Sequence, residues 1–498
     1  MNVLLINPAT GFYLREPSVP LGLLSIATYL KERGYKVHLY DRCVEKVSLE
    51  EVVSAFQPDV VGMSVISIRS IHDGLVTSHL FRERGIPIVW GGQTASVVPE
   101  LVFQEDGADY VVFSEGEVTF YELLRALEKK ESVTHIKGLA YLDETGTMQR
   151  TPDREFADLA DFPVIDWSFI DPRKYFGRFL NCSKMMYLYN AKGCPWQCAF
   201  CFNKDYNRCI YRKRPNEYVI NEIVELVTKY GLNGVYFADE MFGVKKKDLY
   251  AFCDRIRELK LDFVWGCQTR IGHFSREDLQ YMYDSNCRWI YFGVESGSEE
   301  MLNRIHKGID FAKIDEDFQN CREIGITTLG GFIIGFPDET EEQLRDTVYM
   351  ALRTDANLCL IQIFTALPGT ELYDYVVEKG MLTPPKTLTE WGKYPLGDES
   401  AANNYSQVPA RDLYVIQNFF TWRSFLRRDS MNGAGSFIFA WNTITIAMNH
   451  IFKHGFTHGV SSIFSSAKRF FTVVWYSFAY PSVRKKYGLY KKNLGKKL

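Results

Sequence analysis

The sequence predicts an α/β protein with two successive parallel sheets, followed by a mostly helical C-terminal region. Three observations lead to this fold class. Short β-rich runs alternate with longer helical stretches over the first 130 residues, a second alternating series begins near Met185, and aromatic-rich helical segments replace it after about Pro384. Alternation of this kind is typical of a parallel sheet wrapped by helices. At 498 residues the chain is long enough for two or three domains.

The first series predicts a Rossmann-like domain over residues 1–130. Helices are predicted at Leu21–Arg33 and Ile71–Arg84, where apolar residues recur at helical spacing. The predicted strands are Val3–Ile6, Lys36–Tyr40, Val60–Val65, Ile86–Trp90 and Tyr110–Phe113. Ligands of such open sheets bind outside the carboxyl ends of the strands. The loops to examine are therefore Pro8-Ala9, Ser64–Ser67, Gly91–Thr94 and Ser114–Glu117.

The second series predicts a partial (β/α)6 TIM-type barrel over residues 184–384, after a connector at 131–183. The connector contains a short hairpin around Asp143–Gly146 and then a stretch punctuated by Pro and Asp. The predicted barrel strands are Met185–Tyr189, Gly234–Ala238, Phe263–Cys267, Trp289–Val294, Thr328–Ile334 and Leu358–Thr365. In barrels of this type the chemistry lies at the carboxyl ends of the strands.

For residues 385–498 we predict a mostly helical, basic region. From Ser430 onward there are ten Lys and Arg and no Asp or Glu, which leaves 48 basic and 61 acidic residues before it. Such an end either attracts anionic lipid, nucleic acid or an acidic partner protein, or is a solvated tail. The apolar stretch Phe437–Phe452 is interrupted by polar residues, so an interfacial amphipathic segment or a buried lid fits it better than a spanning helix. We expect no nucleic-acid partner.

One cysteine cluster has metal-ligand spacing. Cys194, Cys198 and Cys201 lie directly after the first predicted barrel strand, and such close thiolates favour zinc or an iron-sulfur cluster. A structural zinc site needs four ligands, and Cys209 is a candidate for the fourth. The other cysteines are scattered, and their total of 11 is odd. The N-terminus runs into a predicted strand without a cleavable leader. We therefore expect the protein in a reducing cytoplasm, with peripheral association at the inner membrane face as a further expectation.

The cysteine spacing and its position after a barrel strand resemble the radical SAM superfamily. The resemblance implies a 4Fe-4S cluster held by Cys194, Cys198 and Cys201, with one iron left open to chelate S-adenosylmethionine (SAM). It places Phe200 at the family's aromatic position before the last cysteine. Further motifs follow at successive strand ends. They imply SAM contacts from Asp239 or Glu240 to the ammonium, Arg270 to the carboxylate, Glu295 and Ser296 to the ribose, and Ile333 to the adenine.

The N-terminal domain is similar to the cobalamin-binding domain that precedes the barrel in one branch of this superfamily. Pro20–Leu23 opens the first helix, Gly91-Gly92 follows the fourth strand, and Glu115–Glu117 follows the fifth. The cobalamin contacts implied are Ser64, Ser67, Gly91, Gly92, Gln93, Glu115, Gly116 and Glu117. An Asp-x-His-x-x-Gly motif is absent, so we expect no histidine ligand to cobalt. A Gly-x-Gly-x-x-Gly motif is also absent, which argues against a dinucleotide.

The resemblance covers about residues 1–380 and implies a cobalamin-dependent radical enzyme. A 5′-deoxyadenosyl radical would take hydrogen from an unactivated carbon of a small-molecule, lipid or tetrapyrrole-like substrate, and methylation is the leading outcome. An external one-electron reductant such as flavodoxin or ferredoxin would be required. The alternatives are an oxidative cyclase or rearrangement enzyme, and a zinc-stabilised, non-enzymatic binding module that uses Cys209.

Overall fold

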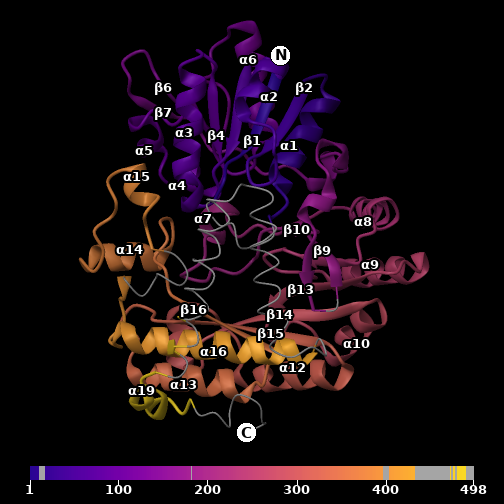
Figure 1. Cartoon of the computed structure of the whole chain (residues 1–498), viewed down its shortest axis with the longest axis vertical. Helices are drawn as coiled ribbons and strands as arrows, with labels where there is room; N and C mark the ends of the chain where they lie inside the picture. The colour runs from indigo at the N-terminus through magenta and orange to yellow at the C-terminus, as the bar shows by residue number, and fades with distance from the viewer. Residues whose placement is uncertain are drawn as a thin grey trace. The chain divides into compact units, whose positions relative to one another are not determined.

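The protein folds into two compact units, each built on its own sheet (Figure 1). This computed structural model describes residues 1–10, 17–180, 182–395, 403–431, 472, 475–476 and 479–489. The first unit comprises 1–175 together with two later segments, 212–218 and 384–394. The second comprises the described residues of 176–211, 219–383 and 395–498. The chain thus returns to the first unit twice after leaving it.

The first unit contains sheet A, whose strand order is β2-β1-β3-β4-β5-β6-β7. The first five strands are parallel, and β6 and β7 add an antiparallel hairpin at one edge. Side chains of β1 are buried on both faces, as expected for a parallel strand covered by helices on both sides. The strands are β1 (Asn2–Asn7), β2 (Lys36–Asp41), β3 (Val60–Ser64), β4 (Ile88–Gly91), β5 (Tyr110–Val112), β6 (Leu139–Leu142) and β7 (Met148–Arg150).

The helices of the first unit include the two that the sequence predicts after the first and third strands. Local signals fix the ends of others: Ser48 and Glu51 form a capping box at the start of α2. The elements are α1 (Leu21–Glu32), α2 (Leu49–Phe56), η1 (Ile68–Ser70), α3 (Ile71–Arg82), α4 (Gln93–Val97), α5 (Pro99–Gln104), α6 (Gly116–Lys129), η2 (Leu159–Asp161), η3 (Trp167–Phe169), η4 (Pro172–Tyr175), β11 (Arg212–Lys213) and α15 (Leu388–Trp391).

The second unit contains sheet B, whose strand order is β16-β15-β14-β13-β12-β9-β8. Six strands run parallel and neighbour each other in chain order, and β8 pairs antiparallel with β9. This sequential arrangement is that of a half-barrel, and it confirms the predicted fold class. The strands are β8 (Gly177–Phe179), β9 (Cys182–Leu188), β10 (Ala191–Lys192), β12 (Gly234–Phe237), β13 (Val264–Arg270), β14 (Cys287–Glu295), β15 (Thr327–Ile334) and β16 (Leu358–Ile363).

Helices pack against one face of sheet B. Phe237 of β12 and Trp265 of β13 lie on this face, where their rings contact Phe252 of α9. Phe292 of β14 packs similarly against Phe318 of α12. The helices that follow the first barrel strand are α7 (Asn203–Tyr206), α8 (Asn216–Tyr230), α9 (Lys246–Leu259), α10 (Arg276–Asp284), α11 (Glu299–Arg304), α12 (Phe311–Ile324), α13 (Glu341–Arg353), α14 (Glu371–Glu378), α16 (Ala410–Met431) and α19 (Pro481–Lys486).

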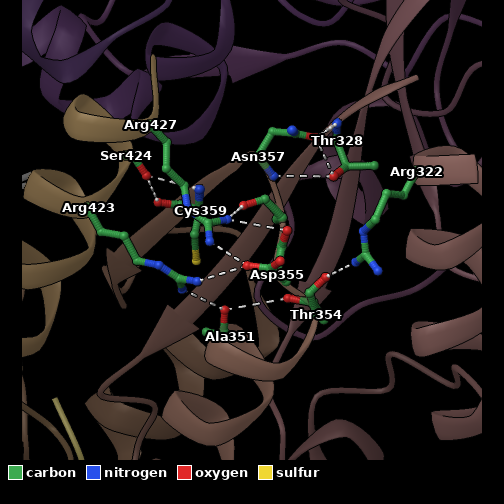
Figure 2. A network of polar contacts seen from close by, with 11 residues as sticks. Arg322, Thr328, Ala351, Thr354, Asp355, Asn357, Cys359, Arg423, Ser424 and Arg427 are labelled. Atoms are coloured by element: carbon green, nitrogen blue, oxygen red, sulfur yellow. Dashed lines mark hydrogen bonds and ion pairs between the residues drawn. The ribbon is translucent and has the colours of Figure 1, made fainter. Parts of the chain in front are cut away.

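Helix α16 covers the edge strand β16, and Figure 2 shows the polar contacts at one end of this interface. The Ser424 hydroxyl donates to the Cys359 carbonyl (2.8 Å) and accepts from the Cys359 amide (3.0 Å). Arg423 and Arg427 both pair with Asp355, in the turn before β16. An edge strand exposes unpaired backbone groups. The helix therefore supplies hydrogen bonds that a further strand would otherwise make.

The expectations for the C-terminal end fall mainly on residues that are not described. The stretch Phe437–Phe452 lies wholly outside the described residues, as does most of the basic end. The described part beyond Pro384 contains the helices α15, α16 and α19. Among the described residues, no helix combines the length and the apolar character needed to cross a membrane.

Candidate functional site

The cysteine-bearing loop begins directly after β10, at Gly193. Gly193 has φ +81°, and a Cβ atom there would lie 2.1 Å from the carbonyl oxygen of Ile210, so only glycine allows the loop to close on itself. The buried Asn203 holds the loop from inside: its Oδ1 accepts from the Cys194 amide (2.9 Å), and its Nδ2 donates to the Trp196 carbonyl (3.1 Å). The backbone around the cysteines is therefore fixed by protein contacts.

The loop brings together Cys194, Cys198 and Cys201, which are close enough to influence one another's ionisation. Burial raises the pKa of the Cys194 thiol, and it raises the pKa of Cys201 to about 11. The Lys307 ammonium acts in the opposite direction on both thiols. Iron binds thiolates, so the site combines a low-dielectric pocket with a nearby cation that favours the ligating form.

Arg270, at the carboxyl end of β13, reaches the cysteine loop. Its guanidinium lies 3.9 Å from the centre of the Trp196 ring and forms a side-chain hydrogen bond with Cys198. The residue is only 8% exposed, and its Nη2 atom is buried without a hydrogen-bond partner in the described protein. A buried guanidinium nitrogen of this kind is costly unless an acceptor reaches it. The site therefore has a cationic donor prepared for an anionic group beside the thiols.

The carboxyl end of β14 carries a buried ion pair. Lys307 Nζ lies 2.7 Å from Glu295 Oε1, and the two side chains are 9% and 11% exposed. Glu295 has φ +69°, in the left-handed region that non-glycine residues rarely adopt, and β14 is irregular at this point. The left-handed backbone and the ion pair fix its carboxylate.

The two carboxylates after β12 occupy different environments. Asp239 is 1% exposed and accepts from the Asn190 amide at 2.7 Å, so it ties together the ends of β9 and β12. Glu240 is exposed, accepts from the Gly193 amide (2.9 Å) and from the Asn207 side chain (3.1 Å), and acts on the ionisation of Cys194. Glu240 is thus the carboxylate next to the cysteine loop.

The remaining candidates on sheet B lie in different settings. Ser296 is fully buried and shares a hydrogen bond of 2.9 Å with Thr347, so its hydroxyl belongs to the packing of α13. Phe200 packs against Phe336, with 5.9 Å between the ring centroids. Ile333 is half-buried near the end of β15. Of these three, Phe200 is in the cysteine loop itself.

On sheet A, the candidates lie in the loops after β3, β4 and β5, at the carboxyl edge. Gly91 has room above it, since a Cβ atom there would meet only the Val112 oxygen, at 3.8 Å. Gly92 has φ +96°, and a Cβ would come within 2.9 Å of the Val65 backbone, so it permits two loops to approach closely. Gln93 follows these glycines in the chain at the start of α4, and Ser64, at the end of β3, pairs with Gly91 across the sheet; both side chains are half-buried.

Three other sheet A candidates have clear structural partners. Ser67 caps η1, because its hydroxyl accepts from the Arg69 amide at 3.3 Å. Glu117 is 2% exposed and accepts from the Ser25 hydroxyl at 2.6 Å, which ties α6 to α1. At Gly116, a Cβ atom would come within 2.9 Å of Ile26, so this glycine allows the same two helices to pack closely.

Glu115 pairs with a residue from the first segment that returns to this unit. Arg212 Nη1 lies 2.6 Å from Glu115 Oε2, and the side chains are 11% and 12% exposed. The guanidinium also stacks 4.0 Å from the centre of the Phe156 ring. The loop after β5 is thereby held by the chain segment that directly follows the cysteine loop in sequence.

Comparisons with known proteins match both units. The sequence profile of the B12 binding domain matches residues 13–124, and that of the radical SAM superfamily matches residues 191–351. The chain is a radical SAM enzyme with a cobalamin-binding domain. The non-enzymatic interpretation is therefore abandoned, and the enzyme's cofactors are a 4Fe-4S cluster, SAM and cobalamin.

Individual relatives of this radical SAM enzyme cover most of its length. An uncharacterized methyltransferase of Pyrococcus horikoshii is 29% identical, covering 79% of this chain and 86% of its own. The anaerobic magnesium-protoporphyrin IX monomethyl ester cyclase of Rubrivivax gelatinosus is 25% identical, covering 76% and 70%. The structure of the radical SAM methyltransferase TsrM from Kitasatospora setae superposes with a TM-score of 0.65 at 22% identity, covering 77% of each chain, which shows a shared fold.

The residues of the radical SAM enzyme fit the groups that its domains imply. Three thiols in one loop suit a cluster with an open iron, and the partnerless Nη2 of Arg270 suits the carboxylate of SAM. At the edge of sheet A, Gly91 leaves the backbone without a side chain, and a Cβ atom there would meet only the Val112 oxygen at an ordinary contact distance of 3.8 Å, so a ligand can approach the strand end closely. The zinc alternative fits less well. Among the described residues, no three His, Cys, Asp or Glu side chains are arranged to hold one metal ion. The thiol of Cys209, the candidate fourth zinc ligand, donates to the Trp196 carbonyl at 3.5 Å.

Three residues of this site did not stand out in the sequence. Lys307 lies in a loop after α11 and carries no motif, although it pairs with Glu295. Asn203 follows the last cysteine by two positions, a spacing that indicates a helix start as readily as a loop clasp. Arg212 is joined to Glu115 across 97 positions of sequence. Of the three, only Asn203 could have been suspected, because it lies two positions after Cys201.

Proposed function

We propose that this enzyme is a C-methyltransferase that places a methyl group on an unactivated carbon of a small-molecule substrate. The observation that carries the proposal is the buried guanidinium of Arg270 beside three thiols, whose Nη2 atom has no hydrogen-bond partner in the described protein, in a chain that also has a B12 binding domain. A cluster alone would account for radical formation. Cobalamin adds a methyl carrier, and the Pyrococcus horikoshii relative is named as a methyltransferase.

The residues of sheet B would divide the binding of the cluster and SAM between them. Cys194, Cys198 and Cys201 would ligate three irons, and Arg270 would bind the SAM carboxylate. We assign the ammonium contact to Glu240, because it is exposed near Cys194, whereas Asp239 is buried and accepts a hydrogen bond from the Asn190 amide. The buried pairing of Glu295 with Lys307 would present the free edge of its carboxylate to the ribose.

Apolar side chains would complete the SAM site. Ile333 would contact the adenine from β15, and Phe200 would shield the cluster from water on the side where it packs against Phe336. On sheet A, the space above Gly91 and the polar groups of Ser64 and Gln93 would receive cobalamin. Ser67, Gly92, Glu115, Gly116 and Glu117 would act indirectly, by shaping those loops.

When bound, the cluster supplies the electron that cleaves SAM reductively, and cobalamin supplies the methyl group that replaces a hydrogen atom of the substrate. Each turnover then consumes two SAM molecules and two electrons, which an external reductant such as flavodoxin or ferredoxin would provide. The products are the methylated substrate, methionine, 5′-deoxyadenosine and S-adenosylhomocysteine. The protein's part is to hold SAM by its charged ends and to exclude water.

An oxidative cyclase is the second candidate, because the Rubrivivax gelatinosus relative is named as one. A cyclase would use the same cluster and the same SAM contacts, but it would not consume a second SAM as a methyl donor. The two functions therefore differ in one product.

The test is anaerobic incubation of the fully loaded enzyme with reductant and SAM, followed by quantification of nucleosides. A methyltransferase forms both 5′-deoxyadenosine and S-adenosylhomocysteine. Formation of 5′-deoxyadenosine alone, in enzyme that retains cobalamin, would favour the cyclase. The Cys198→Ala variant is the control, since it should form no 5′-deoxyadenosine.

The basic C-terminal end motivates a separate proposal of membrane-surface association. Ten cationic and no acidic residues lie beyond Ser430. Such a segment is attracted to anionic lipid at about 1 kcal/mol per cation near the surface. Binding to vesicles containing phosphatidylserine should fall when the chain is truncated near Ser430, and unchanged binding would end the proposal.

A further inference from the structure

Sheet B has a second face, opposite the helices, that carries a distinct set of side chains. Strand residues alternate between faces, and the helix-side positions are those of Phe237, Trp265 and Phe292. The strand register aligns the other face: Tyr187 pairs with Tyr236, and Gln268 pairs with Tyr291. The positions on this face are Met185, Tyr187, Gly234, Tyr236, Val264, Gly266, Gln268, Trp289, Tyr291, Leu329, Gly331, Ile333, Leu358, Leu360 and Gln362. These side chains are uncharged, and the charged residue that continues this face is Arg270, two positions after Gln268 at the carboxyl end of β13.

An apolar plug closes the amino-terminal end of this face. Met185, Trp289, Leu329 and Leu358 are each at most 6% exposed and pack together with Cys182. A Cβ atom at Gly266 would lie 2.1 Å from the Trp289 indole nitrogen, so this glycine makes the room that the indole fills. Anything that binds on the face must therefore lie between this plug and the carboxyl edge.

Tyrosines form the middle of the face. The rings of Tyr187 and Tyr236 are 5.5 Å apart and nearly perpendicular, and the Tyr236 hydroxyl donates to Gln268 Oε1 at 3.3 Å. The hydroxyl end of Tyr291 occupies the space beside Gly331, where a Cβ atom would come within 1.9 Å of the phenol oxygen. Burial raises the pKa of Tyr236 and of Tyr291 above the ordinary value, so both phenols are neutral. The surface thus offers aromatic faces and neutral hydrogen-bonding groups.

This face is partly open. Tyr187 is 42% exposed, and Leu360 on β16 is 39% exposed, both high values for side chains on a barrel strand. Gln362 is also exposed, and Ile333 is half-buried. Tyr187 and Leu360 therefore leave this face accessible, and surfaces lined by aromatic and apolar side chains with a few polar groups are typical ligand sites.

Charge is confined to the carboxyl edge of the face. Arg270 there contacts the cysteine loop, and Glu295 and Lys307 neutralise each other at 2.7 Å. Below this edge, none of the described side chains on the face is a cation that could compensate a phosphate or carboxylate of a ligand. Transferring an unpaired anion to such a surface is strongly unfavourable.

We propose that this face, bounded by Tyr187, Tyr236, Tyr291 and Leu360, is the substrate floor, and that it selects an uncharged, ring-bearing molecule with a hydroxyl or carbonyl group. The proposal rests on the proposed function, because it places the substrate beside the SAM site. The ring would lie on the phenol faces and Leu360. The polar group would bond to the tyrosine hydroxyls or to the carboxamides of Gln268 and Gln362.

Two probes that share one aromatic ring system but differ in carrying a hydroxyl or an anionic phosphate test this selection on the loaded, full-length enzyme. Equilibrium dialysis with 2-naphthol and with 2-naphthyl phosphate gives their dissociation constants directly. We expect 2-naphthol to bind at least about tenfold more tightly, because the phosphate would meet no cation on the floor. Equal or tighter binding of the phosphate would overturn the proposal, and this comparison requires no variant.

A charge-adding variant tests whether the probes bind on the substrate floor. Leu360→Lys adds a cation there, and because Leu360 is already 39% exposed the change is compatible with folding. It should weaken 2-naphthol binding and strengthen binding of the phosphate, which reverses the preference. Leu142→Lys is the matched control, since Leu142 is 43% exposed on β6 of the other unit and should leave both constants unchanged. If Leu360→Lys also leaves both constants unchanged, the floor is not the binding surface.

The outcomes separate this proposal from the proposed function. If the enzyme forms 5′-deoxyadenosine and S-adenosylhomocysteine but prefers the anionic probe, only the substrate class is wrong. If it prefers 2-naphthol but forms neither product, the proposed function is wrong while the surface remains selective.

Discussion

The buried pair between Lys307 and Glu295 gives the sharpest energetic prediction. At 2.7 Å, two unit charges attract by about 6 kcal/mol at an effective dielectric constant of about 20. Lys307→Met removes the cation bonded to Glu295 and leaves its carboxylate, 11% exposed, with Arg270 as the remaining cation that acts on it. Breaking one side of a buried pair costs about 3–5 kcal/mol. We expect a loss of that size in the free energy of unfolding.

Urea unfolding of the loaded enzyme under anaerobic conditions measures this loss. The double variant Lys307→Met with Glu295→Gln should recover most of it, because no buried charge remains. Isothermal titration should also show weaker SAM binding in Lys307→Met, since Glu295 would no longer be held in its left-handed conformation. A loss below about 1 kcal/mol, typical of an exposed pair, would refute the reasoning, as would a double variant no more stable than Lys307→Met.

Three other sites give predictions of different kinds. Burial raises the pKa of Glu339 from 4.5 to about 8, so between these pH values the unfolded chain loses this proton while the folded chain keeps it. The free energy of unfolding should therefore fall by up to about 5 kcal/mol as pH rises from 4.5 to 8. Urea unfolding at several pH values should show this fall in the wild type and not in Glu339→Gln. Gly193→Ala puts a Cβ against the Ile210 carbonyl and should lower the iron content per chain while circular dichroism stays unchanged. Ser424→Ala removes the hydrogen bonds to the Cys359 amide and carbonyl, so the free energy of unfolding should fall by about 1–3 kcal/mol and the melting temperature should fall with it. An unaltered melting temperature would exclude that edge contact.

The sheets were predictable because strands of parallel sheets are buried on both faces and therefore appear as continuous apolar runs, such as Val3–Ile6. The return of segments 212–218 and 384–394 to the first unit was not predictable. It depends on contacts such as that of the Leu388 amide with Glu105, which are separated by 283 positions and have no local signature. Local pattern therefore predicts elements better than it predicts which unit a late segment joins.

For the site, the spacing of the cysteines was sufficient to predict the loop that carries the triad. The direction of individual side chains was not predictable. Ser296 and Glu117 stand at strand ends or loop positions where ligand contacts were expected, yet they are buried against Thr347 and Ser25. A strand end fixes the place of the Cα atom, whereas packing of the adjoining helices decides where the side chain points.

The central claim is that Cys194, Cys198 and Cys201 hold a four-iron cluster whose open iron binds SAM. Electron paramagnetic resonance of the dithionite-reduced enzyme, recorded with and without SAM, tests it most directly. The account predicts a reduced-cluster signal that changes on addition of SAM and disappears in Cys198→Ala but not in Cys209→Ala. A signal that is indifferent to SAM, or that is lost in Cys209→Ala, would contradict it, because the cluster would then have four protein ligands and no open iron.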